Sequence, residues 1–296
     1  MLQTKTKEDI EILRQAGKIL GSILKELEKA VQDSFAGHDQ ASGGAATSGT
    51  NSGSNADPKT INSLDLENLA RKLTAEAGAT PAFLGYTPEG ADRPFPAALV
   101  LSINDVVVHG IPNEKIQVIL PGDLVTLDMG ISYKGRIVDS AITICAGGED
   151  KTDERGRKLL QAGRECLDAA LVACKNWRTE YPKGIKTGDI GAEIEKANAY
   201  YKKTYGFNMA EYLGGHGVGF SVHEDPFIPN FGKKGQGPTL VPGTVVAIEP
   251  ILNEGKEHIR LEPDGYTIKT KDGKRSVHFE HTIVITAEGA EVLTEV

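Results

Sequence analysis

Apolar residues recur every three or four positions over residues 7–32, KEDIEILRQAGKILGSILKELEKAVQ. This spacing predicts an amphipathic helix whose apolar stripe packs on the rest of the protein. Three further segments show helical spacing, at about 64–77, 153–177 and 188–204. Asp65 is the expected N-terminal cap of the second of these four helices, and Gly78 is its expected end.

Alternating and β-rich runs predict strands in two stretches, each of which follows a pair of helices. In the first stretch, the runs DLVTLDMGIS and IVDSAITIC flank a turn, YKGR, at residues 133–136. The second stretch contains TVVAIEPIL at 244–252 and VHFEHTIVIT at 277–286. The predicted order is therefore helix, helix, strands, helix, helix, strands, which is an α+β chain.

Three short sequence matches accompany this repeated order of elements. They are LRQAGKIL (13–20) with LLQAGREC (159–166), LPGDLVTLD (120–128) with VPGTVVAIE (241–249), and VDSAITI (138–144) with FEHTIVI (279–285). Similar elements attract similar residues by chance, but three matches in one order favour a true repeat. We therefore expect a single domain of two related halves, about 1–148 and 149–296, with a cleft between them.

Composition narrows the class of protein. The chain has 296 residues, of which 39% are hydrophobic and 25% charged, enough to bury a sizeable core. Its net charge of -8 argues against nucleic acid or an anionic membrane as a partner and favours a cationic ligand. There is no apolar signal-peptide core and no run approaching the roughly 20 apolar residues of a membrane span, so we expect a cytoplasmic protein. The three cysteines lack a C-x-x-C pair and are expected to be free thiols.

One segment, residues 36–58, differs sharply from the rest of the chain. Its sequence, AGHDQASGGAATSGTNSGSNADP, consists almost entirely of small and polar residues. Because it offers almost nothing to bury, we expect a flexible Gly/Ser-rich surface insertion and assign it no chemistry.

Four acidic residues occupy matched positions in the two halves. Asp128 corresponds to Glu249, and Asp139 to Glu280. Acids at strand ends are commonly exposed, and for any one of these residues alone that interpretation would be preferred. Four acids flanked by apolar residues would instead repel one another unless cations compensated their charge, which predicts one or two divalent metal ions.

The first pair of acids has a geometry that follows from the turn between the strands. A symmetric turn on Lys134 and Gly135 puts Asp128 opposite Ala141, which makes Asp139 its diagonal neighbour on the same face. Diagonal neighbours lie about 7 to 8 Å apart, so both side chains can reach one ion. A slip of one residue in the register would send one carboxylate to the other face.

His216 lies in the glycine-rich run GGHGVGFSVHEDP at residues 214–226. Its glycines let the backbone approach an ion closely, so His216 is a candidate fifth ligand. An oxygen-rich site with a single imidazole suits Mn, Fe or Co and tolerates Zn. A phosphate-binding loop would follow a strand and open a helix, whereas this run continues with alternation and two prolines.

Five segments resemble the methionine aminopeptidases, metallopeptidases of the M24 type. They are LSINDVVVHGIP (101–112), GDLVTLDMG (122–130), the glycine-rich run (214–226), AIEPIL (247–252) and FEHTIVIT (279–286). The resemblance implies a pita-bread fold, with two pseudo-symmetric ααββ halves around a central antiparallel sheet, and removal of the initiator methionine from nascent proteins. His216 and Glu249 are 33 residues apart, which leaves no room for the helical subdomain of the type II enzymes, so we expect a type I enzyme.

The resemblance implies two divalent ions held by the four acids and His216. Asp139 and Glu280 would bridge the ions, Asp128 would hold one of them, and His216 with Glu249 would hold the other. Glu249 would also carry a proton from the attacking water to the leaving nitrogen.

Further residues acquire roles by the same resemblance. His109 and His223 would hydrogen-bond the peptide and stabilise the tetrahedral intermediate. A monovalent cation would be held by the backbone oxygens of Asn104, Val106 and Ser276.

Two other histidines lie beside Glu280. His278 precedes it by two residues on the same strand face and is a candidate to contact the ligands from behind. His281 points to the other face and is expected to pack or form a hydrogen bond.

A pocket for the methionine side chain is also implied, at positions Phe83, Tyr86, Val222 and Tyr266. Val222 stands where family members commonly have phenylalanine, and Phe95 is a candidate to fill the space this leaves. Val100 matches a pocket position too, but we expect it to be an ordinary core residue.

Two alternatives to methionine removal stay open. The same site could act on another N-terminal residue or before proline, as Xaa-Pro peptidases of this fold do, although these typically carry a large extra N-terminal domain. A non-catalytic binding protein could also retain the metals. For the enzyme, the expected partners are nascent polypeptide N-termini at the ribosome, and the expected state is a monomer.

Overall fold

The computed structural model describes residues 2–36 and 60–295. The insertion predicted at 36–58 lies outside the described residues except for Ala36. Five α-helices and one short 3-10 helix are described, namely α1 (Lys7–Asp33), α2 (Ser63–Glu76), η2 (Glu149–Lys151), α3 (Glu154–Lys175), α4 (Trp177–Glu180) and α5 (Thr187–Tyr205). All four predicted helices are therefore present. The prediction of one helix over 153–177 is wrong at its end, because α3 stops at Lys175 and α4 begins at Trp177.

The start of α2 differs from the prediction by three residues. Asn62 is the cap, and its side chain accepts hydrogen bonds from the N–H groups of Leu64 and Asp65 at 2.9 and 3.1 Å. Asp65 returns a bond, accepting from the N–H of Asn62 at 3.2 Å. The pair forms a capping box, in which Asp65 is the third helical residue and not the cap. Gly78 ends the turn as expected, with φ of 68°.

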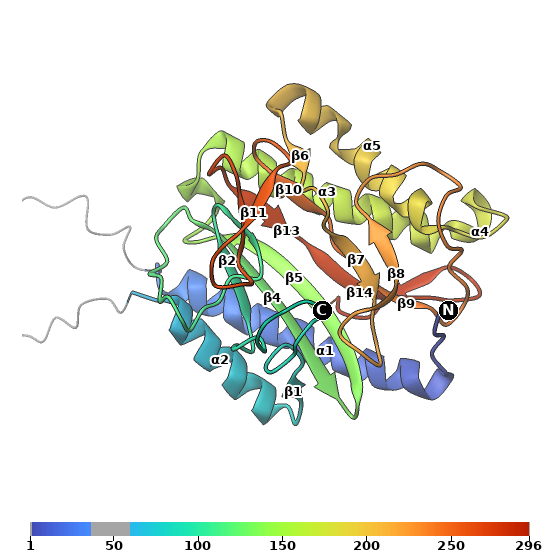
Figure 1. Cartoon of the computed structure of the whole chain (residues 1–296), viewed down its shortest axis with the longest axis horizontal. Helices are drawn as coiled ribbons and strands as arrows, with labels where there is room; N and C mark the ends of the chain where they lie inside the picture. The colour runs from blue at the N-terminus through green and yellow to red at the C-terminus, as the bar shows by residue number, and fades with distance from the viewer. Residues whose placement is uncertain (1, 37–59, 296) are drawn as a thin grey trace, which may run out of the picture.

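A nine-stranded sheet runs through the centre of the molecule (Figure 1). Its path is β1 (Thr80–Pro81), β4 (Leu124–Tyr133), β5 (Arg136–Cys145), β14 (Glu280–Ile285), β9 (Val245–Ile248), β7 (Gly214–Gly217) and β8 (Glu224–Pro229), with β2 (Val100–Ile103) on β4 and β15 (Ala290–Val292) on β14. Every pairing is antiparallel. The order β4-β5-β14-β9 places the strands matched by the sequence repeat symmetrically about the β5–β14 contact.

Two three-stranded sheets complete the fold. One contains β13 (Ser276–His278), β10 (Ile251–Asn253) and β6 (Asn208–Met209), and the other β11 (Ile259–Leu261), β12 (Ile268–Thr270) and β3 (Val106–Val108). The runs 244–252 and 277–286 are each divided between the large sheet and one small sheet. The first division falls at Glu249 and Pro250, and proline has no N–H to continue a strand ladder.

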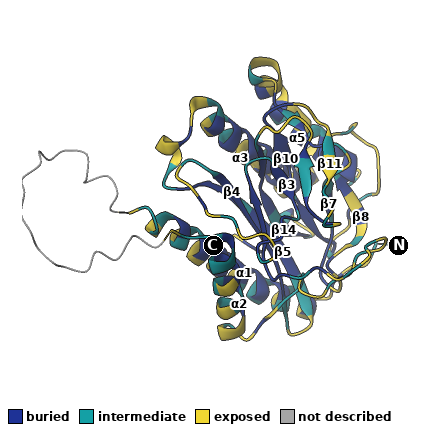
Figure 2. Ribbon diagram, turned by 60° about the vertical axis from the view of Figure 1, so that its left-hand side comes forward, coloured by how far each residue is buried: buried dark blue, intermediate teal, exposed yellow. Residues whose placement is uncertain are grey.

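The helices cover the sheet in two groups. Helix α1 packs on β4 and β5, and α3 packs on α5, β10, β13 and β15. Leucines at helical spacing on α1, such as Leu13, Leu20 and Leu27, are fully buried, and each contributes about 1.5 to 3 kcal/mol by leaving water. Figure 2 shows the resulting interior, with buried strands next to helices whose outer surfaces are exposed.

The predicted state of the three cysteines is confirmed. Cys145, Cys166 and Cys174 are buried free thiols. Over residues 2–36 and 60–295, no helix is both long and apolar enough to cross a membrane.

Candidate metal centre and substrate cleft

The sheet register places the predicted ligands on one face. Asp128 pairs with Ala141 of β5, and Ala141 pairs in turn with Glu280 of β14. The two acids therefore flank a small side chain in one row across the sheet. Asp139 is two residues from Ala141 and faces the same side, which confirms the diagonal geometry predicted from the turn.

A second row brings in the histidine. His216 pairs with Ala247 of β9, and Ala247 pairs with Thr282 of β14. Thr282 is two residues beyond Glu280, and Glu249 is two residues beyond Ala247. By the two-residue period of strands, all these side chains point to the same face.

The ligand atoms converge within this face. One atom each from Asp139, His216 and Glu280 lie within 4.8 Å of one another. Nε2 of His216 is 3.7 Å from Oε1 of Glu249. Asp128, Asp139 and Glu280 are buried, and Oδ1 of Asp139 has no hydrogen-bond partner. An uncompensated cluster of buried carboxylates and an unpartnered oxygen fit a divalent cation, so the residues present suit the metals implied by the sequence.

The glycines around His216 have a steric role. A Cβ at Gly215 would lie 2.2 Å from the carbonyl oxygen of Ala247, and one at Gly217 would lie 2.2 Å from that of Asp225. Only glycine lets β7 fit between its neighbours at these points. Nδ1 of His216 lies 2.9 Å from the carbonyl oxygen of Gly217, which can only accept, so Nδ1 carries the hydrogen and Nε2 is free to bind a metal.

Two residues that fix the ligands left no signal in the sequence. The hydroxyl of Thr282 accepts from the N–H of Asp139 at 2.9 Å and donates to its carbonyl at 2.7 Å. The side chain of Asn230, itself buried, donates to the carbonyl of Glu249 at 2.9 Å. The partners are 143 and 19 residues apart in the chain, so no local pattern of residues reports either contact.

Burial and mutual repulsion raise the pKa values of three acids. Burial raises the pKa of Asp139 to about 6. The pKa values of Asp128 and Glu280 also rise, first by burial and then by the neighbouring carboxylates. Glu249 is the exception, because His278 and His216 lower its pKa against the effect of burial. The cluster thus disfavours its own negative charge, which is the condition a cation relieves.

The two predicted substrate histidines lie beside the ligands. The rings of His223 and His216 are 4.4 Å apart between centroids. Burial lowers the pKa of His109. Desolvation of the ring by surrounding protein atoms, and then the charge of His216, lower the pKa of His223 to about 4. Both imidazoles are therefore neutral near pH 7, each with one N–H to donate. His109 also has a left-handed backbone, with φ of 59°, which is uncommon for a residue other than glycine.

These histidines and the five predicted ligands line one cavity of about 450 Å³. All four predicted pocket residues, Phe83, Tyr86, Val222 and Tyr266, line it too. Phe95 packs edge-on against Tyr266 with ring centroids 5.1 Å apart and also lines the cavity. Val100 is a buried core residue, as expected, and it also lines the same cavity.

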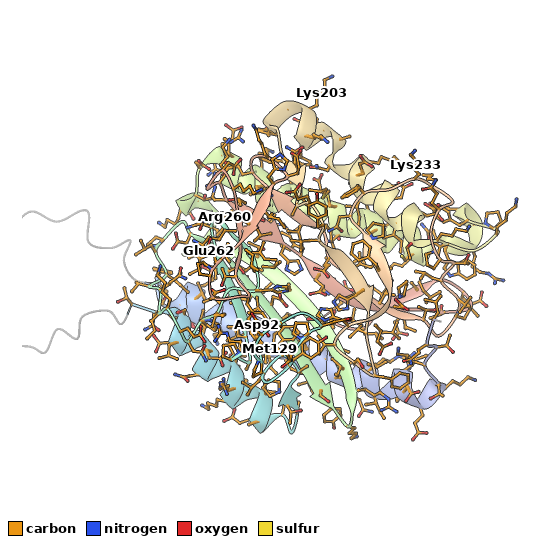
Figure 3. The ribbon with its side chains drawn as sticks, in the orientation of Figure 1. Asp92, Met129, Lys203, Lys233, Arg260 and Glu262 are labelled. Carbon is orange, nitrogen blue, oxygen red and sulfur yellow. The ribbon has the colours of Figure 1, made fainter. Side chains whose placement is uncertain are left out.

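The mouth of the cavity is partly apolar. Leu261 on β11 is 63% exposed and lines the opening. It lies between Arg260 and Glu262, which form an ion pair of 2.7 Å and are labelled in Figure 3. Met129, also labelled, follows Asp128 on β4 and is fully buried on the opposite face of the sheet.

The loop that carries Val222 and His223 is held by the N-terminal segment. Glu224 accepts hydrogen bonds from the N–H groups of Phe220 and Ser221 at 2.6 and 2.9 Å. Its other oxygen meets Nζ of Lys5 at 2.5 Å, and the side chains of Lys5 and Glu224 are only 1% and 8% exposed. Nothing in the sequence near Lys5 pointed to this contact.

The other predicted residues can also be placed. His281 faces away from the ligands and bonds Thr294 at 2.9 Å, as expected. The backbone N–H of Ser276 donates to the carbonyl of Asn104 at 2.8 Å, and Val106 begins β3. The monovalent cation site at these last three residues stays a prediction. Residues 218–244, all of which are described, contain β8 and no helix, as expected for a type I enzyme.

Known proteins share both the sequence and the fold. Metallopeptidase family M24 matches residues 11–287. A methionine aminopeptidase of Aquifex aeolicus is 46% identical over 239 residues, which cover 79% of this chain and 86% of that protein. Methionine aminopeptidase 1 of Bacillus subtilis is 32% identical over 296 residues and is covered completely.

Solved structures agree with these sequence matches. The crystal structure of methionine aminopeptidase from Thermotoga maritima superposes with a TM-score of 0.81 at 34% identity, covering 100% of both chains. Prolidase from Pyrococcus furiosus is 22% identical, with a TM-score of 0.64, and the match covers 99% of this chain and 65% of that one. At this identity the likeness shows a common fold only. The chain therefore belongs to metallopeptidase family M24, as a metal-dependent hydrolase among the methionine aminopeptidases.

Proposed function

We propose that this protein removes the N-terminal methionine from newly made proteins by hydrolysis at a site with two divalent metal ions. The observation that carries the proposal is the meeting of Asp139, His216 and Glu280 within 4.8 Å, on the sheet face that also presents Asp128 and Glu249. The adjoining cavity of about 450 Å³ has room for a substrate side chain.

Asp128, Asp139, His216, Glu249 and Glu280 would together hold the ions. An oxygen-rich set with one imidazole accepts Mn, Fe, Co or Zn. When bound, the ions would polarise the scissile carbonyl and lower the pKa of a bound water.

The protein's own residues would supply proton transfer and hydrogen bonds. Glu249, whose pKa is held down by His278 and His216 against its burial, is ionised near pH 7 and would accept a proton from the attacking water. It would then pass this proton to the leaving nitrogen. His109 and His223, neutral because their pKa values are lowered, would each donate an N–H to the peptide.

The proposed substrate sets the proposed partners. Polypeptide N-termini emerge at the ribosome in the cytoplasm, so we place the protein there, acting as a monomer. The substrate carries an N-terminal amine, and a net charge of -8 on the enzyme favours the approach of a cationic group.

Peptide cleavage with defined metal content tests the proposal. The protein, loaded with Mn²⁺ or Co²⁺, is given Met-Ala-Ser, Leu-Ala-Ser and Ala-Pro-Ala, with and without a chelator. Cleavage of the first peptide alone, abolished by the chelator and by Glu249→Gln, is the expected result. Preferential cleavage of Ala-Pro-Ala would assign an Xaa-Pro specificity instead, and no turnover of any peptide at full metal occupancy would indicate a binding protein.

A further inference from the structure

His278, at the end of β13, lines the cavity beside the predicted ligands and is buried, with 2% of its surface exposed. The hydroxyl of Thr143 fixes its backbone, accepting from the His278 N–H at 2.9 Å and donating to the carbonyl at 2.7 Å. Neither ring nitrogen has a hydrogen-bond partner of good geometry. Because an unpartnered buried polar group costs free energy, we expect this imidazole to gain a partner within the site.

Three carboxylates surround the ring at distances slightly longer than hydrogen bonds. Nε2 lies 3.4 Å from Oε2 of Glu249 and 3.8 Å from Oε2 of Glu280, and Nδ1 lies 4.0 Å from Oδ2 of Asp128. The shortest contact is therefore to Glu249. The other oxygen of that carboxylate, Oε1, lies 3.7 Å from Nε2 of His216. Glu249 is thus placed between two imidazoles, one for each of its oxygens.

We propose that His278 is a positioning residue, whose Nε2–H holds Oε2 of Glu249 so that Oε1 stays directed at the space next to His216. This inference rests on the proposed function, in which Glu249 binds metal and accepts a proton. A carboxylate held through one oxygen loses less rotational freedom when the other oxygen binds an ion, so the contact raises metal affinity.

The need for such a contact arises from the fold around Glu249. This residue follows the last residue of β9 and precedes Pro250, so it lies at a break between two sheets. Asn230 holds the backbone carbonyl of Glu249. The side chain of Glu249, however, is longer by one methylene than those of Asp128 and Asp139. His278 supplies the second point of attachment.

Direct coordination by His278 is the competing explanation. Two ligand atoms each about 2.1 Å from one ion lie at most about 4.2 Å apart, which all three contacts satisfy. The positioning role is favoured because the nearest oxygen is the one directed away from His216.

The experiment compares His278→Leu with His278→Gln. The glutamine amide reaches about as far as Nε2 and donates a hydrogen bond, whereas leucine cannot. Co²⁺ is titrated into metal-free protein and followed by its visible absorption, and kcat and KM are then measured with Met-Ala-Ser. We expect the leucine variant to lose about tenfold or more in Co²⁺ affinity and in kcat, with KM little changed, and the glutamine variant to recover most of both.

The control is His281→Gln, which alters a histidine that faces away and bonds Thr294, and which should leave Co²⁺ affinity unchanged. Wild-type affinity and kcat in His278→Leu, or equal damage in the leucine and glutamine variants, would overturn the proposal. So would a cobalt spectrum that loses an imidazole ligand in both. If the leucine variant does not fold, His278→Asn provides the same contrast, since its amide falls short of Glu249.

The outcomes also separate this inference from the proposed function. Failure of the wild type to cleave any of the three peptides would refute the function, yet the effect of His278 on Co²⁺ affinity would still decide its positioning role. Cleavage by the wild type, with no change of affinity or kcat in His278→Leu, would refute the positioning role alone.

Discussion

The two halves of the molecule bring their acids to one cleft by different routes. Asp128 and Asp139 lie inside unbroken ten-residue strands, where a continuous ladder of pairs fixes their position. Glu249 follows the end of β9, and Glu280 is the first residue of β14. The first half thus provides a rigid frame with short side chains, whereas the second half uses longer side chains at strand breaks and fixes them by contacts such as Asn230 with Glu249.

The largest effect expected from this comparison concerns the histidines, one from each half. His109→Ala should lower kcat by about 100-fold to 1000-fold, because a neutral imidazole with a fixed backbone would donate to the developing oxyanion. His223→Ala should cost less, since His223 is exposed at the cleft wall. Steady-state kinetics with Met-Ala-Ser measure both losses. Metal content should be unchanged in each variant, and loss of metal would show that the histidine is a ligand.

Lengthening or shortening an acidic side chain tests the contrast between the continuous β4–β5 ladder and the strand breaks of the second half. Asp128→Glu and Glu249→Asp keep the charge but move the carboxylate by about 1 Å, which should cost about 100-fold in kcat/KM at Asp128. The loss at Glu249 should be smaller, because the chain at a strand break can shift where the β4–β5 ladder cannot. Glu288→Asp, at an exposed turn, is the matched control. Equal losses at both positions would remove the proposed difference between the halves.

The buried Lys5–Glu224 pair tests how the second half holds the loop that carries Val222 and His223. Lys5→Met should lower the free energy of unfolding by about 2 kcal/mol, less than for most broken buried pairs because Glu224 keeps two backbone donors. KM should rise as the loop carrying Val222 and His223 loosens. Chemical denaturation and kinetics measure the two effects. Lys7→Met, at an exposed position, should change neither.

The smallest expected effect compares the helix starts of the two halves. Thr6 and then Arg136 lower the pKa of Asp9 to about 2 from its ordinary 3.8, so its ionised form stabilises α1. Asp9→Asn should cost about 1 kcal/mol near pH 7, and the difference should fade as pH drops from about 4 through about 2, where the wild type also loses the charge. Asp153→Asn, at the more exposed start of α3, should cost less. Denaturation curves at pH 7, 4 and 2 check both, and a difference that persists at pH 2 would contradict the assignment.

Prediction from the sequence succeeded where a local rule governs the structure. The hairpin on Lys134 and Gly135 sets the register of Asp128 and Asp139, because turn length and side-chain alternation leave one arrangement. The helices follow from apolar spacing in the same way. The cap of α2 was misplaced because Asn62 and Asp65 bond each other reciprocally, and either residue type begins helices.

Prediction failed where the partner lies far along the chain. The burial of Val100 in the core follows from its apolar strand, but its place beside the cavity depends on the fold. Thr282, Asn230 and Lys5 were missed because threonine, asparagine and lysine are ordinary surface residues unless the fold buries them.

The amino-acid sequence determined the elements, the repeat and the identities of the five candidate ligands, because periodicity, turn chemistry and motif spacing are local properties. The convergence of these ligands was decided by tertiary structure alone. The β5–β14 pairing joins residues nearly half the chain apart and places Ala141 beside Glu280. The tertiary fold also buries His278 among three carboxylates, and this low-dielectric setting makes an ordinary histidine a candidate for holding Glu249 in place.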